Sequence, residues 1–147
     1  IRQLQPWFEN VGKRLVKAPK VYFRDTGLLH ALLRLRTGRE LQTYPKLGFS
    51  WEGFALEQVL STTPAGQAFF WGTHAGAELD LVLFRRGRRF GVEFKAGDAP
   101  DMTKSLHIAL NDLKLERAWI VYPGRETYPV HKKVEVIPLD LFLKKSL

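Results

Sequence analysis

Cysteine is absent from the 147 residues of this chain, which excludes a disulfide framework and a thiolate metal site. Histidine is scarce, and the four histidines lie too far apart in the sequence to predict a zinc site. No apolar run approaches the roughly 18 residues that a membrane-spanning helix needs, and the start of the chain lacks the layout of a signal peptide. No glycine-rich phosphate loop ending in Gly-Lys-Ser or Gly-Lys-Thr occurs. A cytoplasmic protein without a membrane partner is therefore expected.

Basic residues are in excess, with 23 Lys and Arg against 15 Asp and Glu and a formal net charge of +8. This excess suits a polyanionic partner such as DNA or RNA, and it is equally typical of a bias that favours solubility. The length and the hydrophobic content of 45% predict one compact domain. Because the chain begins with Ile1 and its one methionine is Met102, we expect it to be a piece of a longer protein.

Residues 1–48 predict an N-terminal helical segment that packs on the rest of the chain or leads into it. A first helix over residues 6–16 has Pro6 at its first position, where a missing N–H is tolerated. After a brief extended stretch, Asp25 or Thr26 caps a second helix. The leucines of this second helix form a broad apolar stripe, for which we expect core packing; they are Leu28, Leu29, Leu32, Leu33 and Leu35.

Residues 49–147 predict an α/β core of the mixed-sheet, α+β kind. Its elements are expected in the order helix, strand, strand, strand, helix, strand, at residues 50–62, 68–72, 78–83, 90–95, 101–115 and 118–122. A right-handed crossover through the second helix makes the last of these strands parallel to residues 90–95. Residues 38–48 are expected to be a polar connection, residues 134–137 an edge strand, and residues 139–145 a final helix.

A β-hairpin is the most informative feature, and its strands join at a tight turn centred on Arg86-Gly87. Folding the chain at this turn sets Asp80 opposite Glu93 and Glu78 opposite Lys95. The other face is then apolar, because its residues are Leu79, Leu81 and Leu83 opposite Phe94, Val92 and Phe90. A slip of one residue would mix the two faces, so the pattern specifies the register.

The polar face of this hairpin suits metal-assisted hydrolysis of a phosphodiester. Asp80 and Glu93 would repel each other unless a cation lay between them, and carboxylate oxygens are the ligands that Mg²⁺ and Mn²⁺ prefer. Lys95 lies beside them, where a fixed positive charge stabilises a transition state that gains negative charge. Gly91 is expected to leave the space beside the acids open. In the alternative interpretation these groups only pair across a solvated face, with Glu78 as the salt-bridge partner of Lys95.

The helix over residues 50–62 contributes a further candidate. It is apolar on nearly every side, so its acids, Glu52 and Glu57, are exceptions, and at least one is expected to face protein. A partly buried acid needs a partner, a metal ion or a raised pKa. If the helix packs over the polar face of the hairpin, Glu57 joins the cluster as a third carboxylate.

Four arginines around the hairpin turn could hold a nucleic acid by its backbone without reading its sequence. They are Arg85, Arg86, Arg88 and Arg89.

Glu57 on a helix, then Asp80, then Glu93-Phe94-Lys95, in this order of elements, resembles the PD-(D/E)XK restriction-endonuclease-like superfamily, including its resolvase-type members. The proline that names the motif is absent, since Leu79 precedes Asp80. The resemblance implies a restriction-endonuclease-like core. On this hypothesis Asp80 and Glu93 bind Mg²⁺ or Mn²⁺, Glu57 is a third ligand or a supporting acid, and Lys95 orients water or stabilises the transition state.

A longer resemblance covers almost the whole chain. Residues 17–28, 53–57, 78–80 and 93–95 look like the uncharacterised C-terminal domain of bacterial and archaeal AAA-type ATPases. In that family a P-loop ATPase module and a winged-helix segment come first. The resemblance therefore implies that an upstream ATPase module of the same protein is a partner and that ATP binds there.

Three functions remain open as hypotheses. The first is a Mg²⁺- or Mn²⁺-dependent nuclease or DNA-processing domain. The second is a nuclease-fold module that no longer cuts and docks the ATPase onto DNA or a partner protein. The third is assembly, in which the leucine-rich N-terminal segment contacts the ATPase or a second copy of the chain as a homo-oligomer.

Overall fold

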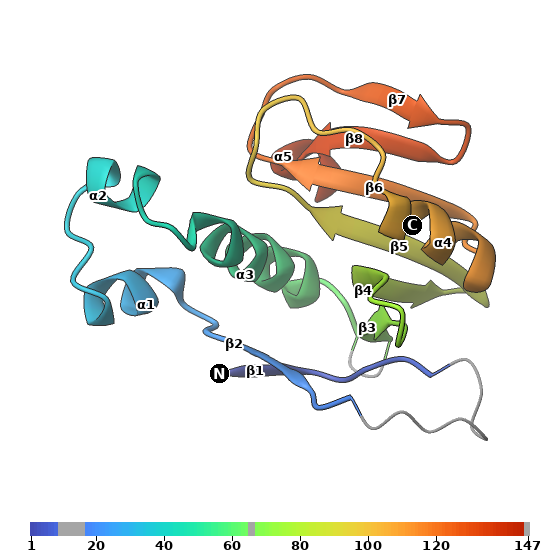
Figure 1. The fold of residues 1–147 in the computed structure, drawn as a ribbon, viewed down its shortest axis with the longest axis horizontal. Coiled ribbons are helices and arrows are strands. Elements are labelled where there is room, and N and C mark those ends of the chain that lie inside the picture. Colours follow the sequence, from blue (N-terminus) through green and yellow to red (C-terminus); the bar gives the residue numbers. More distant parts are fainter. Residues whose placement is uncertain (9–16, 65–66, 146–147) are drawn as a thin grey trace.

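The computed structural model describes residues 1–8, 17–64 and 67–145 (Figure 1). These residues form a six-stranded mixed sheet, a separate two-stranded sheet and five helices. In chain order the elements are β1 (Arg2–Leu4), β2 (Lys20–Tyr22), α1 (Thr26–Leu32), α2 (Gly38–Gln42), α3 (Leu47–Ser61), β3 (Ala68–Gly72), β4 (Glu78–Arg85), β5 (Arg88–Phe94), α4 (Lys104–Asp112), β6 (Arg117–Tyr122), β7 (Tyr128–His131), β8 (Val134–Pro138) and α5 (Leu139–Phe142). Within these residues, no helix combines the length and apolar character needed to span a bilayer.

The large sheet has the strand order β3-β4-β5-β6-β8-β7. Strands β3, β4 and β5 are antiparallel neighbours, and β6 runs parallel to β5, which confirms the predicted meander and crossover. The predicted edge position of residues 134–137 is wrong, because β8 lies between β6 and β7. Strand β7 forms that edge instead, and its Pro129, which cannot donate a ladder hydrogen bond, is tolerated there.

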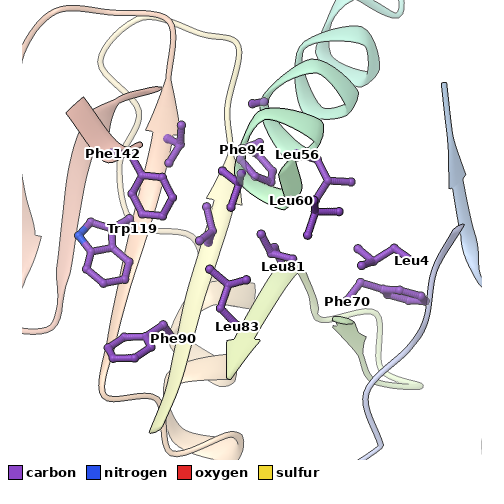
Figure 2. Packing of buried hydrophobic residues seen from close by; sticks show 14 of the residues in the cluster. Leu4, Leu56, Leu60, Phe70, Leu81, Leu83, Phe90, Phe94, Trp119 and Phe142 are labelled. Atoms are coloured by element: carbon purple, nitrogen blue, oxygen red, sulfur yellow. The ribbon is translucent and has the colours of Figure 1, made fainter. Parts of the chain in front are cut away.

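The six-stranded sheet separates two apolar clusters, which are named the α3 cluster and the α4 cluster after the helices that cover them. Helices α3 and α5 cover one face, where Leu56 and Leu60 of α3 and Phe142 of α5 pack on strand residues (Figure 2). Helix α4 covers the other face with Leu106 and Leu110. The apolar run of α3 is explained in part by burial of Ala55, Leu56, Val59 and Leu60 in the α3 cluster, whereas Phe49 and Phe54 remain exposed.

The predicted hairpin register is confirmed over the paired positions, which include Leu81 opposite Val92 and Leu83 opposite Phe90. The turn residues Arg86 and Gly87 have φ angles of +49° and +75°. Two successive left-handed residues match the right-handed twist of the flanking strands, as in type I′ turns.

One part of the apolar face differs from the prediction. In the β3–β4 pairing, Phe69 lies opposite Val82 but Trp71 lies opposite Leu79, so β4 contains one extra residue. Such a bulge reverses the alternation of side chains. Leu79 therefore packs in the α4 cluster with Val82, whereas Leu81 packs in the α3 cluster.

Gly91 has a packing role rather than the predicted role of leaving space beside the acids. A Cβ atom at this position would lie 2.7 Å from Leu115 Cδ1, 3.1 Å from Leu79 Cδ2 and 3.2 Å from Ala118 Cβ. The absent side chain lets the α4 cluster pack directly on β5.

The N-terminal segment is not wholly helical. Strands β1 and β2 form an antiparallel pair, and Pro6 bridges to Phe70 of β3. The N–H of Trp7 donates to the Phe70 carbonyl at 2.7 Å. Most of the helix expected over residues 6–16 lies outside the described residues, and its described start is extended, because its main chain pairs with β3.

Helix α1 is capped by Asp25 as predicted, with the Leu28 N–H donating to its carboxylate at 3.0 Å. The expected core packing of its leucines is wrong, because α1 has no buried residue and Leu32 is 64% exposed. Figure 1 shows the reason: α1 and α2 lie beside the start of α3 and away from the large sheet.

Helix α2 occupies residues expected to form a polar connection. Thr37 and Glu40 make a reciprocal capping box, a local signal strong enough to begin a short helix in a polar segment.

Candidate functional site

Asp80 lies at the beginning of β4. Its carboxylate accepts a main-chain hydrogen bond from β5 that a carbonyl of β4 would otherwise accept. The Lys95 N–H donates to the Val121 carbonyl of β6, so the preceding N–H, that of Phe94, points toward β4. Asp80 Oδ2 accepts this N–H at 2.9 Å. Burial, and then the neighbouring Glu52 carboxylate, raise the pKa of Asp80 to about 6.

Glu52 reaches the same place from α3. Tyr22 donates its hydroxyl to Glu52 Oε1 at 2.6 Å. Lys20 Nζ lies 3.5 Å from that oxygen and 3.6 Å from Asp80 Oδ1, so one ammonium contacts both carboxylates. Lys20 and Tyr22 stand two residues apart on β2, which puts both side chains on one face of the strand.

Glu93 and Lys95 make the second half of the site, at the carboxyl end of β5. Glu93 is buried, and its Oε1 lies 2.7 Å from Lys95 Nζ. The Thr103 hydroxyl donates to Glu93 Oε2 at 2.9 Å, and the same hydroxyl oxygen caps α4 by accepting the Leu106 N–H. The helix cap therefore fixes the orientation of this carboxylate.

Lys20, Tyr22, Glu52, Asp80, Glu93 and Lys95 form one charged cluster. Its acids shift the pKa values of Tyr22 and Lys95. Burial opposes the charged form of Lys95, but its hydrogen bond to Glu93 and the nearby carboxylates outweigh burial and raise the pKa of Lys95. The pKa of Tyr22 is raised by burial and then by the Glu52 carboxylate. Lys95 is therefore a fixed positive charge and Tyr22 a neutral donor at physiological pH.

The cluster borders an open pocket of about 320 Å³. Its lining residues include one acid from each of two elements and two lysines: Pro45, Lys46, Gly48, Phe49, Glu52, Asp80, Phe94, Lys95 and Ala96. Phe49 is 68% exposed at this pocket. The pocket therefore presents acidic, basic and aromatic side chains together.

Glu57 does not join these carboxylates, contrary to expectation. Arg2 Nη2 lies 2.7 Å and Arg24 Nε 2.8 Å from Glu57 Oε1, and Arg2 Nε donates to Glu57 Oε2 at 2.9 Å. Five residues separate Glu52 from Glu57, which rotates their side chains about 140° apart around the helix. The helix-borne carboxylate of the cluster is therefore Glu52, and the hydrogen bonds from Arg2, opposed by burial, hold the pKa of Glu57 below its usual value.

Glu78 also lies apart from its expected partner. It is paired with Lys17 at 3.3 Å, while Lys95 is paired with Glu93. Since the bulge follows Glu78 in β4, the regular alternation that predicted its pairing with Lys95 does not extend to it.

The hairpin arginines lie at the other end of β4 and β5 from Asp80 and Glu93. Arg85 donates to the Gln67 side chain at 3.2 Å and Arg89 to the Leu113 carbonyl at 3.2 Å. Arg88 lies 3.7 Å from Glu116. Their role in holding nucleic acid, like that of Arg86, stays a prediction.

The donor chemistry of the cluster fits a hard divalent cation, because its carboxylate oxygens come from separate elements and already gather around one ammonium. Among the residues that the structure describes, no three His, Asp or Glu side chains form a ready-made metal group. Sequence reasoning missed Lys20 and Tyr22, although their alternation on a strand was a usable signal. It named Glu52 as an acid that could face protein but preferred Glu57.

Comparison with known proteins gives two family matches. Residues 47–142 match a domain of unknown function (DUF4143), and residues 1–39 match a second one (DUF8612). Uncharacterized proteins of Mycobacterium bovis and Mycobacterium tuberculosis are each 46% identical over 143 residues, which is 97% of this chain and 32% of either relative. The chain thus spans about a third of the length of these relatives. No solved structure matches it. Since the first match covers more than half of the chain, the chain belongs to the DUF4143 family of domains of unknown function.

Proposed function

We propose that this chain is a nuclease-like domain with a restriction-endonuclease-like core that hydrolyses phosphodiesters with Mg²⁺ or Mn²⁺. One observation carries the proposal: Glu52, Asp80, Glu93 and Lys95 come from three different elements and act on one another electrostatically. Three of the four line an open pocket. The order of strands and helices around them supports the same proposal.

In this proposal Asp80, Glu52 and Glu93 would converge on the cation through a shift of their side chains, because they form no ready-made group of three ligands among the described residues. The bound cation would polarise a phosphoryl oxygen and lower the pKa of a bound water. Lys95 stays protonated because its pKa is raised, so it serves as a fixed charge for the phosphate rather than as a base. Thr103 keeps Glu93 in one orientation through its hydrogen bond.

The proposal extends to an upstream module of the same protein and to the partner that the domain binds. We infer that the chain follows an AAA-type ATPase module, which binds ATP, and that DNA is the partner. The greater length of the relatives leaves room for such a module.

Incubation with linear, nicked and branched DNA in Mg²⁺ or Mn²⁺ tests the activity. We expect cleavage that falls by at least about a hundredfold in both variants, because Lys95→Ala loses the fixed positive charge for the phosphate and Glu93→Ala loses a ligand of the cation. Lys17→Ala is the matched control, since Lys17 pairs with exposed Glu78 outside the cluster. Cleavage that is unchanged in Lys95→Ala and Glu93→Ala would rule out this site.

A second candidate function is non-catalytic docking onto DNA or a partner protein. It is favoured by the exposed leucines of α1 and by an apolar pocket of about 260 Å³ that lies between β2, α1 and the start of α3. Salt-dependent DNA binding without cleavage or Mn²⁺ uptake would support this function over the first.

A further inference from the structure

We propose that Lys20 is a built-in counter-ion that competes with a divalent cation for the Glu52 and Asp80 carboxylates. The site then takes up metal only when the Lys20 ammonium withdraws. This inference rests on the metal-dependent function proposed above and adds a control on it.

The Lys20 ammonium is shared between two carboxylates, and its distance to each is longer than in a tight ion pair. Its Nζ lies 3.5 Å from Glu52 and 3.6 Å from Asp80. Strong charge-assisted hydrogen bonds are about 2.7–2.9 Å long, and Lys95 makes one with Glu93 at 2.7 Å. Lys20 therefore occupies the place between two carboxylates that a cation needs, without the short contacts that would make it hard to displace.

The charge balance favours an exchange. Three carboxylates meet two ammonium groups in this cluster, which leaves one negative charge. If a divalent cation replaces the Lys20 ammonium, the cluster becomes neutral. If the cation enters while Lys20 stays, it must bind beside a positive charge, which opposes binding strongly at such short distances.

Strand β2 can carry Lys20 away by breaking the hydrogen bond from Tyr22 to Glu52, because no residue of β2 is fully buried. It has three residues and pairs with β1 in a separate two-stranded sheet, outside the six-stranded sheet that holds Asp80 and Glu93. Figure 1 shows this two-stranded ribbon beside the large sheet. Release of β2 from β1, which stays anchored to β3, would therefore be coupled to metal uptake.

Calorimetric titration of the purified chain with Mn²⁺ tests this inference. We expect Lys20→Met to bind Mn²⁺ roughly tenfold more tightly than the wild type or better, and Asp80→Asn to abolish the binding. Methionine keeps an apolar stem near Phe70, whose ring centroid lies 5.4 Å from Lys20 Nζ. Lys17→Met, which removes a lysine that pairs with Glu78, is the matched control and should change the affinity by no more than about twofold.

The wild-type protein gives a readout that does not depend on a variant. Saturation with Mn²⁺ should accelerate amide hydrogen exchange in β2 and leave α4 unchanged, since only β2 must move. Equal Mn²⁺ affinity in wild type and Lys20→Met, or unchanged exchange in β2, would overturn the inference while leaving the metal site in place. Absence of Mn²⁺ binding in every variant would instead overturn the metal-dependent function and this inference with it.

Discussion

Glu52 and Glu57 lie five residues apart on α3, and their carboxylates have entirely different partners. Glu52 contacts Tyr22 and Lys20 beside Asp80, whereas both oxygens of Glu57 are held by arginines. The helical rotation between them, about 140°, is enough to place Glu52 beside Asp80 and to direct Glu57 to Arg2 and Arg24. One helix thereby carries both an acid of the candidate site and an acid of a separate ion-pair network.

This division predicts opposite phenotypes for two matched substitutions. Glu52→Gln should weaken Mn²⁺ binding and cleavage by at least about tenfold, because an amide is a weaker cation ligand than a carboxylate. Glu57→Gln should leave Mn²⁺ affinity unchanged and lower the free energy of unfolding by about 1–3 kcal/mol, because the arginines lose a charged acceptor. Calorimetric titration and urea denaturation of both variants check this. Loss of Mn²⁺ binding in Glu57→Gln alone would contradict the assignment.

The ion pairs of Glu57 also predict a pH dependence. Its pKa in the folded state lies below the ordinary value of 4.5, so folding favours the charged carboxylate. The resulting stabilisation is fully present above about pH 4.5 and disappears as the pH falls through the lowered pKa. The difference in unfolding free energy between wild type and Glu57→Gln should therefore shrink on acidification. Urea denaturation at a series of pH values between 7 and 3 measures it, and a difference that grows toward low pH would contradict the ion pairs.

Gly91 should tolerate no side chain. Gly91→Ala should lower the free energy of unfolding by about 1–3 kcal/mol, because its Cβ would overlap Leu115 and Ala118. Gly48→Ala is the control: nothing lies within 4 Å of its Cβ, and it lies in α3. Alanine there should be neutral or stabilising by up to about 1 kcal/mol. Denaturant unfolding compares the two variants, and equal effects would contradict the packing of Gly91.

The exposed leucines of α1 should contribute little to folding. Leu32→Lys should change the free energy of unfolding by no more than about 0.5 kcal/mol, since the side chain is 64% exposed. Leu106→Ala, at a fully buried site on α4, should destabilise the fold by about 2–5 kcal/mol. Thermal unfolding of the Leu32→Lys and Leu106→Ala variants measures this difference in stability. If α1 mediates self-association, light scattering will also show a smaller particle for Leu32→Lys; a large loss of stability in this variant would show that α1 packs in a core.

The core strands were predictable because their signals are local. Alternating residues on either side of Arg86-Gly87 specify a hairpin, and the register they predict is the one observed from Leu81 to Arg85. The apolar run over β6 and the preceding helix likewise indicated a covered parallel strand. Strand β7 was missed because Pro129 argues against a strand, and only the position at the sheet edge makes it acceptable.

Local patterns were enough to predict the hairpin, the meander and crossover, and the candidates Asp80, Glu93 and Lys95, because strand alternation and turn chemistry act between near neighbours. The folded chain was needed to show which acid of α3 joins them and that Lys20 lies between Glu52 and Asp80. Those outcomes depend on the rotation of α3 over the sheet, on the bulge in β4 and on the placement of β2. Each is set by packing between segments far apart in the chain, which no local pattern encodes.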